Sequence, residues 1–227
     1  CVGLGLGRFL FVFGLWGGGR LGRGSRARPP SAHRRVFAGL QMGFLSVVLW
    51  PILPRPMAVI AGTIFAAATG LGFLRDWLIV SGALNPTDPG YLHVQRRLYW
   101  LFAVMLPPIW RLLLLVAMFS VLRAAAPLLP PAAWQGLLAG WDAPAPAFLA
   151  ALVALIALLA TPLVSLGVLA RALSVALTLP IGFDITVRGL RWDNGLALIG
   201  VVFIQLFGPG PFALWPVEER FIFRRLG

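Results

Sequence analysis

The chain has no lysine, a single cysteine and few charged residues of either sign. Charged side chains make up 11% of its 227 residues, against roughly 25% in soluble domains, while hydrophobic residues make up 59%. With Cys1 as the single cysteine, these residues can form neither an internal disulfide nor a thiolate metal cluster. The composition therefore excludes an ordinary soluble domain and indicates an integral membrane protein.

Long apolar stretches dominate what is present. Several of them reach the ~20 residues that an α-helix needs to cross ~30 Å of hydrocarbon, and the alternating ten-residue segments of outer-membrane barrels are missing. The predicted fold class is therefore all-α, a polytopic transmembrane helical bundle. Six membrane helices are expected, or seven if residues 147–180 cross the membrane twice.

The charge that remains is strongly basic. Lys and Arg together number 19 and every one of them is Arg, against seven acidic residues, which gives a formal net charge of +12. An all-Arg chain rich in Ala, Gly and Pro is typical of a GC-rich bacterial genome. Because the arginines flank apolar spans, anionic lipid headgroups are the expected partners rather than nucleic acid, with other membrane proteins as further partners. The predicted lipid or anion contacts are Arg34, Arg35, Arg75, Arg96, Arg97 and Arg111.

The apolar stretches predict an amino-terminal membrane half (1–123), an Ala/Pro-rich linker (124–146) and a carboxy-terminal half (147–227). Because Cys1 is not a methionine, we expect a chain that begins partway through a longer reading frame or lacks its start. The spans are predicted at residues 2–16, 36–53, 57 to about 75, 98–121, 147–179 and 195–207. The fifth is longer than one crossing needs, so it is either one helix kinked at Pro162 or two short re-entrant pieces.

Two local patterns predict how these segments pack. Gly62, Ala66 and Gly70 lie four residues apart, which favours close contact of one helix face with a neighbour. In the linker, Trp134 and Trp141 indicate interfacial anchors on the extracytoplasmic side.

The arginines also predict a topology for six crossings. The positive-inside tendency places the loop of residues 17–35 in the cytoplasm, which holds six arginines. Arg96, Arg97, Arg188 and Arg191 then fall on the cytoplasmic side. Arg55 and Arg123 fall on the opposite side.

Arg111 is the most deeply placed charge, one turn beyond Pro107 and Pro108, which predict a helix kink. On the first hypothesis it lines a water-filled path or holds an anionic ligand. On the second it bonds carbonyls freed by the prolines or snorkels. The two hypotheses have equal weight.

Two aspartates have predicted structural roles. Asp193, with Asn194, is expected to cap the last helix rather than relay protons. Arg75 and Asp76 are expected at the membrane interface, with Arg96 or Arg97 as the partner of Asp76.

No catalytic pattern is present in the sequence. There is no G-x-S-x-G elbow and no phosphate-binding loop, and His33 and His93 lie in separate loops without metal-ligand spacing. No catalytic residue and no metal site are therefore predicted, and no cofactor can be named.

Residues 34–84 carry a first resemblance. The stretches "HRRVFAGLQMGFLSVVLW" and "GLGFLRDWLIVSG" resemble the carboxy-terminal part of the CDP-alcohol phosphatidyltransferases, integral enzymes of phospholipid synthesis. The family's aspartate array, D-G-x-x-A-R…G-x-x-x-D-x-x-x-D, has no counterpart in the chain, so no catalytic residue is carried over. An array upstream of Cys1 would make the parent protein an enzyme.

A second resemblance covers residues 192–215. The stretch "WDNGLALIGVVFIQLFGPGPFALW" is similar to the last helix of DoxX-like membrane proteins, in which an N-x-A-L-x-G run precedes G-P-G. Together the two resemblances imply a bacterial plasma-membrane protein, multi-pass and non-catalytic as seen. The alternative is a structural or quinone-adjacent subunit of a larger energy-transducing membrane complex.

Overall fold

A computed structural model describes residues 54–125 and 132–217 of the chain. The predicted spans at 2–16 and 36–53, and with them Arg34 and Arg35, lie outside the described residues. The described residues are almost entirely helical, with one isolated β-bridge between Val168 and Trp215. The elements are α3 (Arg55–Val80), α4 (Pro89–Tyr99), the π-helix η1 (Trp100–Met105), α5 (Leu106–Ala125), α6 (Ala132–Ala139), α7 (Pro146–Leu166), α8 (Ala170–Arg188) and α9 (Trp192–Phe207).

Four of the described helices are long and apolar enough to cross a membrane. They are α3, the continuous rod from α4 through η1 to α5, α7 and α8; α9 is apolar but shorter, at 16 residues. The predicted all-α class is thereby confirmed for the described part of the chain. The total of six or seven spans stays a prediction.

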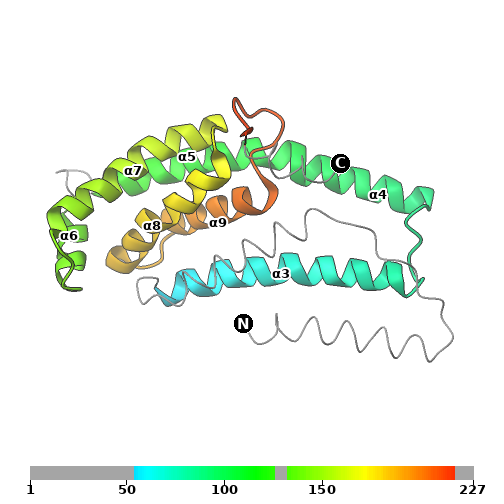
Figure 1. Ribbon diagram of the computed structural model, residues 1–227, viewed down its shortest axis with the longest axis horizontal. Coiled ribbons are helices and arrows are strands. Elements are labelled where there is room, and N and C mark those ends of the chain that lie inside the picture. The colour runs from blue at the N-terminus through cyan, green and yellow to red at the C-terminus, as the bar shows by residue number, and fades with distance from the viewer. Residues whose placement is uncertain (1–53, 126–131, 218–227) are drawn as a thin grey trace.

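The α4–η1–α5 rod and α3 run in opposite directions along the length of the molecule (Figure 1). The rod begins earlier than the predicted start at residue 98, because the Asp88 carboxylate accepts a hydrogen bond from the Tyr91 backbone N–H at 3.2 Å and caps α4. The chain stays helical through Pro107 and Pro108. The wider π-helical turn just before them displaces the carbonyls that a proline ring would meet in an α-helix.

The packed face of α3 differs from the predicted one. Met57, Ala61 and Phe65 are buried, whereas Ala66 and Gly70 are exposed. The predicted small-residue contact of Gly62, Ala66 and Gly70 is therefore wrong at its last two positions. The physical reason is that the buried side of α3, which also contacts α9, carries Met57, Ala61 and Phe65 four residues apart, and Ala66 and Gly70 point away from that line.

The predicted fifth span is two antiparallel helices, α7 and α8, of 21 and 19 residues (Figure 1). The chain turns at Gly167 and Leu169, both in the left-handed region at φ +76° and +44°, while Pro162 remains inside α7. The predicted single helix kinked at Pro162 is therefore wrong. Each of the two helices is long enough to cross, as expected if residues 147–180 cross the membrane twice, and the number of crossings stays a prediction.

The predicted linker, residues 124–146, contains α6. Trp134 of α6 is buried against Phe183 of α8, with ring centroids 5.9 Å apart, and Trp141 meets the same ring at 5.9 Å. Trp134 is thus a packing residue rather than an exposed interfacial anchor. It joins α6 to the end of the α7–α8 pair.

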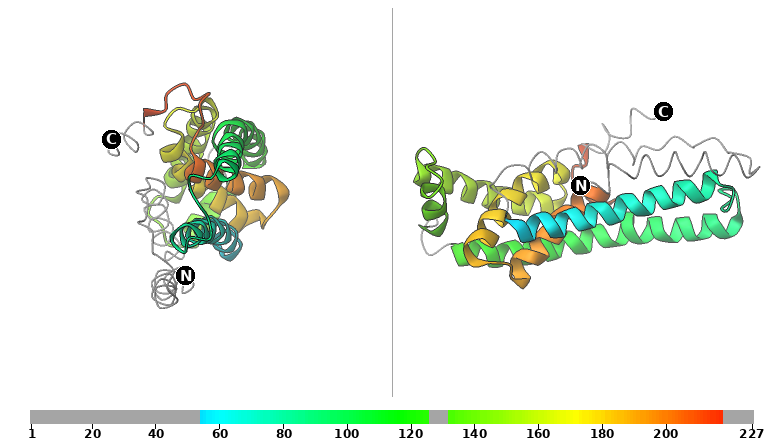
Figure 2. Two further views of the ribbon diagram at one scale, coloured as in Figure 1. Left: turned by 90° about the vertical axis from the view of Figure 1, so that its right-hand side faces the viewer. Right: turned by 90° about the horizontal axis from the view of Figure 1, so that it is seen from below.

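The direction of α9 decides which arginines share an end of the bundle. Asp193 at the start of α9 contacts Ser120 near the end of α5, and Gly210 beyond α9 lies against Pro107 near the start of α5. The α8–α9 turn therefore lies at the end of the bundle that holds α6, here called the α6 end; the opposite end is the α4 end (Figures 1 and 2).

Arg188 and Arg191 accordingly lie at the same end as Arg123, not with Arg96 and Arg97 as predicted. The physical reason is that the chain reverses direction between α7 and α8. The topology predicted for six crossings treated these residues as a single span and so lacked this reversal.

Candidate functional site

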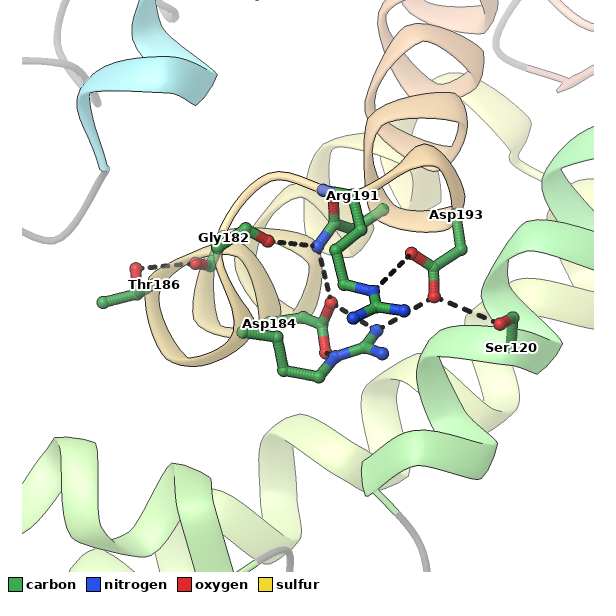
Figure 3. Close-up of polar contacts among 9 residues, drawn as sticks. Ser120, Gly182, Asp184, Thr186, Arg191 and Asp193 are labelled. Atoms are coloured by element: carbon green, nitrogen blue, oxygen red, sulfur yellow. Dashed lines mark hydrogen bonds and ion pairs between the residues drawn. The ribbon is translucent and has the colours of Figure 1, made fainter.

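The most extensive polar cluster is a network at the α6 end, formed by Ser120, Asp184, Arg188, Asp193 and Asn194 (Figure 3). The Arg188 guanidinium donates from Nε and Nη2 to the two oxygens of Asp184, each at 2.6 Å, and from Nη2 to Asp193 Oδ2 at 3.2 Å. Asp184 and Asp193 are both almost fully buried. One cation thus holds two buried carboxylates together.

Asp193 connects this network to a third helix. Its Oδ2 accepts a hydrogen bond from Ser120 Oγ of α5 at 3.1 Å. Its Oδ1 has no hydrogen-bond partner but forms an ion pair with Arg191 Nε at 3.9 Å. Two carboxylates therefore face two guanidinium groups, and their formal charges balance. Burying a charge is tolerable when it is paired and hydrogen-bonded, so this arrangement suits a join between α5, α8 and α9.

Asn194, not Asp193, organises the start of α9. The N-cap of α9 is Arg191, and Asn194 Oδ1 accepts a hydrogen bond from the Arg191 backbone N–H at 2.8 Å. Asn194 Nδ2 donates to the Gly189 carbonyl and to Asp184 Oδ2, each at 2.9 Å. The predicted capping role of Asp193 is wrong, because its side chain is committed to Ser120 and Arg188.

Replacing Asn194 with alanine is expected to lower the free energy of unfolding by about 1–3 kcal/mol, because it removes a helix cap and leaves buried polar partners unsatisfied. Thermal unfolding of the detergent-solubilised protein, followed by tryptophan fluorescence, measures the effect. Asn85→Ala in the α3–α4 turn is the comparison, since Asn85 is exposed and accepts hydrogen bonds from Thr87, two residues away. A loss no larger than that of Asn85→Ala would contradict the assignment.

The ion pair of Asp184 with Arg188 was not predicted from the sequence. Their spacing, four residues apart in "DITVR", is the pattern of an ion pair on one helix face. This spacing can be recognised in the sequence. The contact with Asp193 and Ser120 cannot, because it depends on the turn between α8 and α9.

Arg111 forms a second polar centre, nearer the α4 end. Its side chain is only 4% exposed. Nη2 donates to the Phe212 carbonyl at 3.2 Å, while Nε and Nη1 are buried and have no hydrogen-bond partner. The carbonyl that it meets belongs to the segment after α9, not to the turn preceding Pro107 and Pro108, so the predicted bonding to proline-freed carbonyls is wrong.

Backbone segments from two parts of the chain pack closely against Arg111. A Cβ on Gly167 would overlap Arg111 Nη1 and the Ala213 backbone, and Leu214 N–H donates to the Leu166 carbonyl at 3.0 Å. Ser165 Oγ lies 3.4 Å from the Arg111 carbonyl, to which it donates. The segment 208–215 is thereby held against α5 and the α7–α8 turn.

Arg171, which was not predicted as a site residue, is also a buried cation. Its Nη1 donates to the Gln205 carbonyl and, at 3.3 Å, to the Leu206 carbonyl in the last turn of α9. Carbonyls at a helix carboxy-terminus lack intrahelical donors and carry partial negative charge, so a guanidinium there stabilises the helix end. Arg171 is thus accounted for by helix capping.

The remaining predicted contacts lie at the α4 end. Arg75 Nε donates to the Tyr91 hydroxyl at 2.8 Å, which joins α3 to α4, and Arg96 and Arg97 are exposed on α4. The ion pairs of the described residues do not include the predicted pairing of Asp76 with Arg96 or Arg97. The helical geometry explains this, because α4 presents Tyr91 toward α3 and turns Arg96 and Arg97 outward. Headgroup contact by Arg75, Arg96 and Arg97 stays a prediction.

Within residues 54–125 and 132–217, no group of three or more His, Cys, Asp or Glu side chains is placed to hold a metal ion. Comparison with protein-family models, curated proteins and solved structures finds no match for the chain. Its function must therefore be inferred from its own geometry, and both family resemblances stay predictions.

Proposed function

We propose that the chain is an integral protein of a bacterial plasma membrane whose described helices form a non-catalytic structural unit, related to the CDP-alcohol phosphatidyltransferases through its amino-terminal half and to DoxX-like proteins through its carboxy-terminal half. The observation that carries the structural role is the network of Asp184, Arg188 and Asp193. These buried charges bind one another and Ser120, so they join three helices.

The outer surface of the bundle supports the membrane location. Large apolar side chains are exposed along α3, η1, α5 and α7, where a soluble protein would place polar groups. They include Leu71, Leu74, Trp100, Leu112, Val116, Phe119, Phe148, Leu158 and Leu159. The hydrocarbon tails of lipids solvate such a surface. The four long helices are long enough to cross the hydrocarbon layer of a membrane.

Membrane integration and absence of turnover are tested together. Membranes from a bacterium expressing the chain are extracted with alkaline carbonate, and the purified protein is then incubated with a CDP-activated lipid and Mg²⁺. We expect the protein to remain in the membrane pellet and to give no phospholipid product above that of the same reaction without the protein. Release into the supernatant would contradict the membrane location, and product formation would contradict the non-catalytic role.

One observation favours the alternative, a structural subunit of a larger energy-transducing complex. Neither α4 nor η1 contains a buried residue, although η1 carries Trp100, Leu101 and Met105. Such a surface can pack against another membrane protein as well as against lipid. Purification in a mild detergent distinguishes the two: a chain that runs alone, without quinone, haem or pigment, argues against the subunit.

A further inference from the structure

The unpaired guanidinium of Arg111 is the feature that the structural role leaves unexplained. Arg171, the other buried arginine of the described residues, donates to two carbonyls at the end of α9, and the half-buried Arg188 has two carboxylates as acceptors. Arg111 has one carbonyl, that of Phe212, and two buried nitrogens without a partner.

The position of Arg111 makes this arrangement costly. At ~1.5 Å per residue, Arg111 lies about 20 Å along the rod from Arg97 and about 18 Å from Arg123. If the rod crosses the membrane, as the proposed function holds, both distances place the charge deep within the hydrocarbon. Intramembrane charges are expensive and almost always have a partner, and an unsatisfied charged donor costs more than a neutral one.

We propose that Arg111 is the cationic centre of a binding site for the oxyanion of an amphiphile, a carboxylate or a phosphate attached to a hydrocarbon chain. Its unpaired N–H groups supply charge-assisted hydrogen bonds to an oxyanion. The Phe212 carbonyl occupies only Nη2, so Nε and Nη1 remain for the ligand.

The residues adjacent in sequence to Arg111 and its contacts suit a ligand with a hydrocarbon chain. The exposed residues next to the Arg111 contacts are apolar: Leu112, Leu166, Phe212, Leu214 and Trp215. The segment 208–215 also contains glycines at positive φ, Gly208 and Gly210, beside prolines. This segment covers Arg111, so the ligand enters by displacing it, which also releases Nη2 from the Phe212 carbonyl.

The experiment uses the whole chain in non-ionic detergent and three probes with similar chains: oleate, dioleoyl phosphatidate and the uncharged oleyl alcohol. Binding is measured by titration of tryptophan fluorescence. We expect at least one of the two anions to bind about ten-fold more tightly than oleyl alcohol. Which one does so distinguishes a fatty-acid carboxylate from a lipid phosphate.

Variants assign the effect to the site. Arg111→Gln is expected to abolish the preference for the anion, whereas Arg123→Gln, which removes an exposed cation from the same helix, is expected to retain it. Equal binding of all three probes by the unmodified protein would overturn the proposal, even if no Arg111 variant folds. Retention of the ten-fold preference by Arg111→Gln would overturn it as well. Neither result depends on the carbonate extraction that tests the membrane location.

Discussion

Replacing Gly167 with alanine is expected to lower the free energy of unfolding by roughly 2–6 kcal/mol. Gly167 has φ +76°, a conformation that costs a side-chain-bearing residue roughly 1–3 kcal/mol. Its new Cβ would also overlap the Arg111 guanidinium and the Ala213 backbone. Overpacking of this kind adds roughly 1–3 kcal/mol, because the Ala213 contact is with backbone, which cannot move aside as the end of a flexible side chain can.

Gly82 provides the matched control for this substitution. It has nearly the same φ, +75°, but no atom within 4 Å of the position where a Cβ would stand. Gly82→Ala therefore reports the cost of the backbone conformation alone, roughly 1–3 kcal/mol. Both variants are compared by thermal unfolding in detergent, followed by tryptophan fluorescence. Equal losses in the two variants would show that segment 208–215 does not press on Gly167.

Replacing Asp184 with alanine is the second change with a large expected effect, about 3–5 kcal/mol. Removing one partner of a buried ion pair leaves the other charge uncompensated, and here Arg188 and Asn194 both lose an acceptor. Urea unfolding in mixed micelles gives the free energy, and limited proteolysis at the α8–α9 turn gives an independent measure.

The comparison variants show whether charge pairing is the cause. Arg191→Gln removes a longer and more exposed ion pair, at 3.9 Å, and is expected to change stability by less than about 1 kcal/mol. The double variant Asp184→Leu with Arg188→Met removes both charges and is expected to recover part of the loss. An Asp184→Ala variant as stable as Arg191→Gln would show that the network does not hold the helices together.

Local sequence properties were enough to predict the helical class and several helix positions. Pro54 and Pro56 indicated the start of α3, and the apolar run before "GPGP" indicated the end of α9. Hydropathy and proline content influence helix formation within a few residues, so their effect can be predicted from a single segment of the sequence. The same local reading placed the break of the fifth span at Pro162, although a membrane helix accommodates an internal proline when neighbouring groups satisfy the freed carbonyl.

Of the candidate site, the sequence indicated Arg111 as a deep charge but not its partner. The carbonyl of Phe212 is about a hundred residues away and reaches Arg111 only because α9 returns along α5. The i, i+4 spacing of Asp184 and Arg188 was visible in the sequence, whereas their contact with Asp193 required the turn at Gly189.

The sequence by itself determined that this is a helical membrane protein whose basic side chains, apart from histidine, are all arginine. Composition and hydropathy determine how each segment partitions between water and lipid. The tertiary structure decided which charges share an end of the bundle and which have partners. One reversal at Gly167 and Leu169 moved Arg188 and Arg191 to the end that holds Arg123. Charge pairing depends on the directions of helices far apart in the chain, and no local pattern contains those directions.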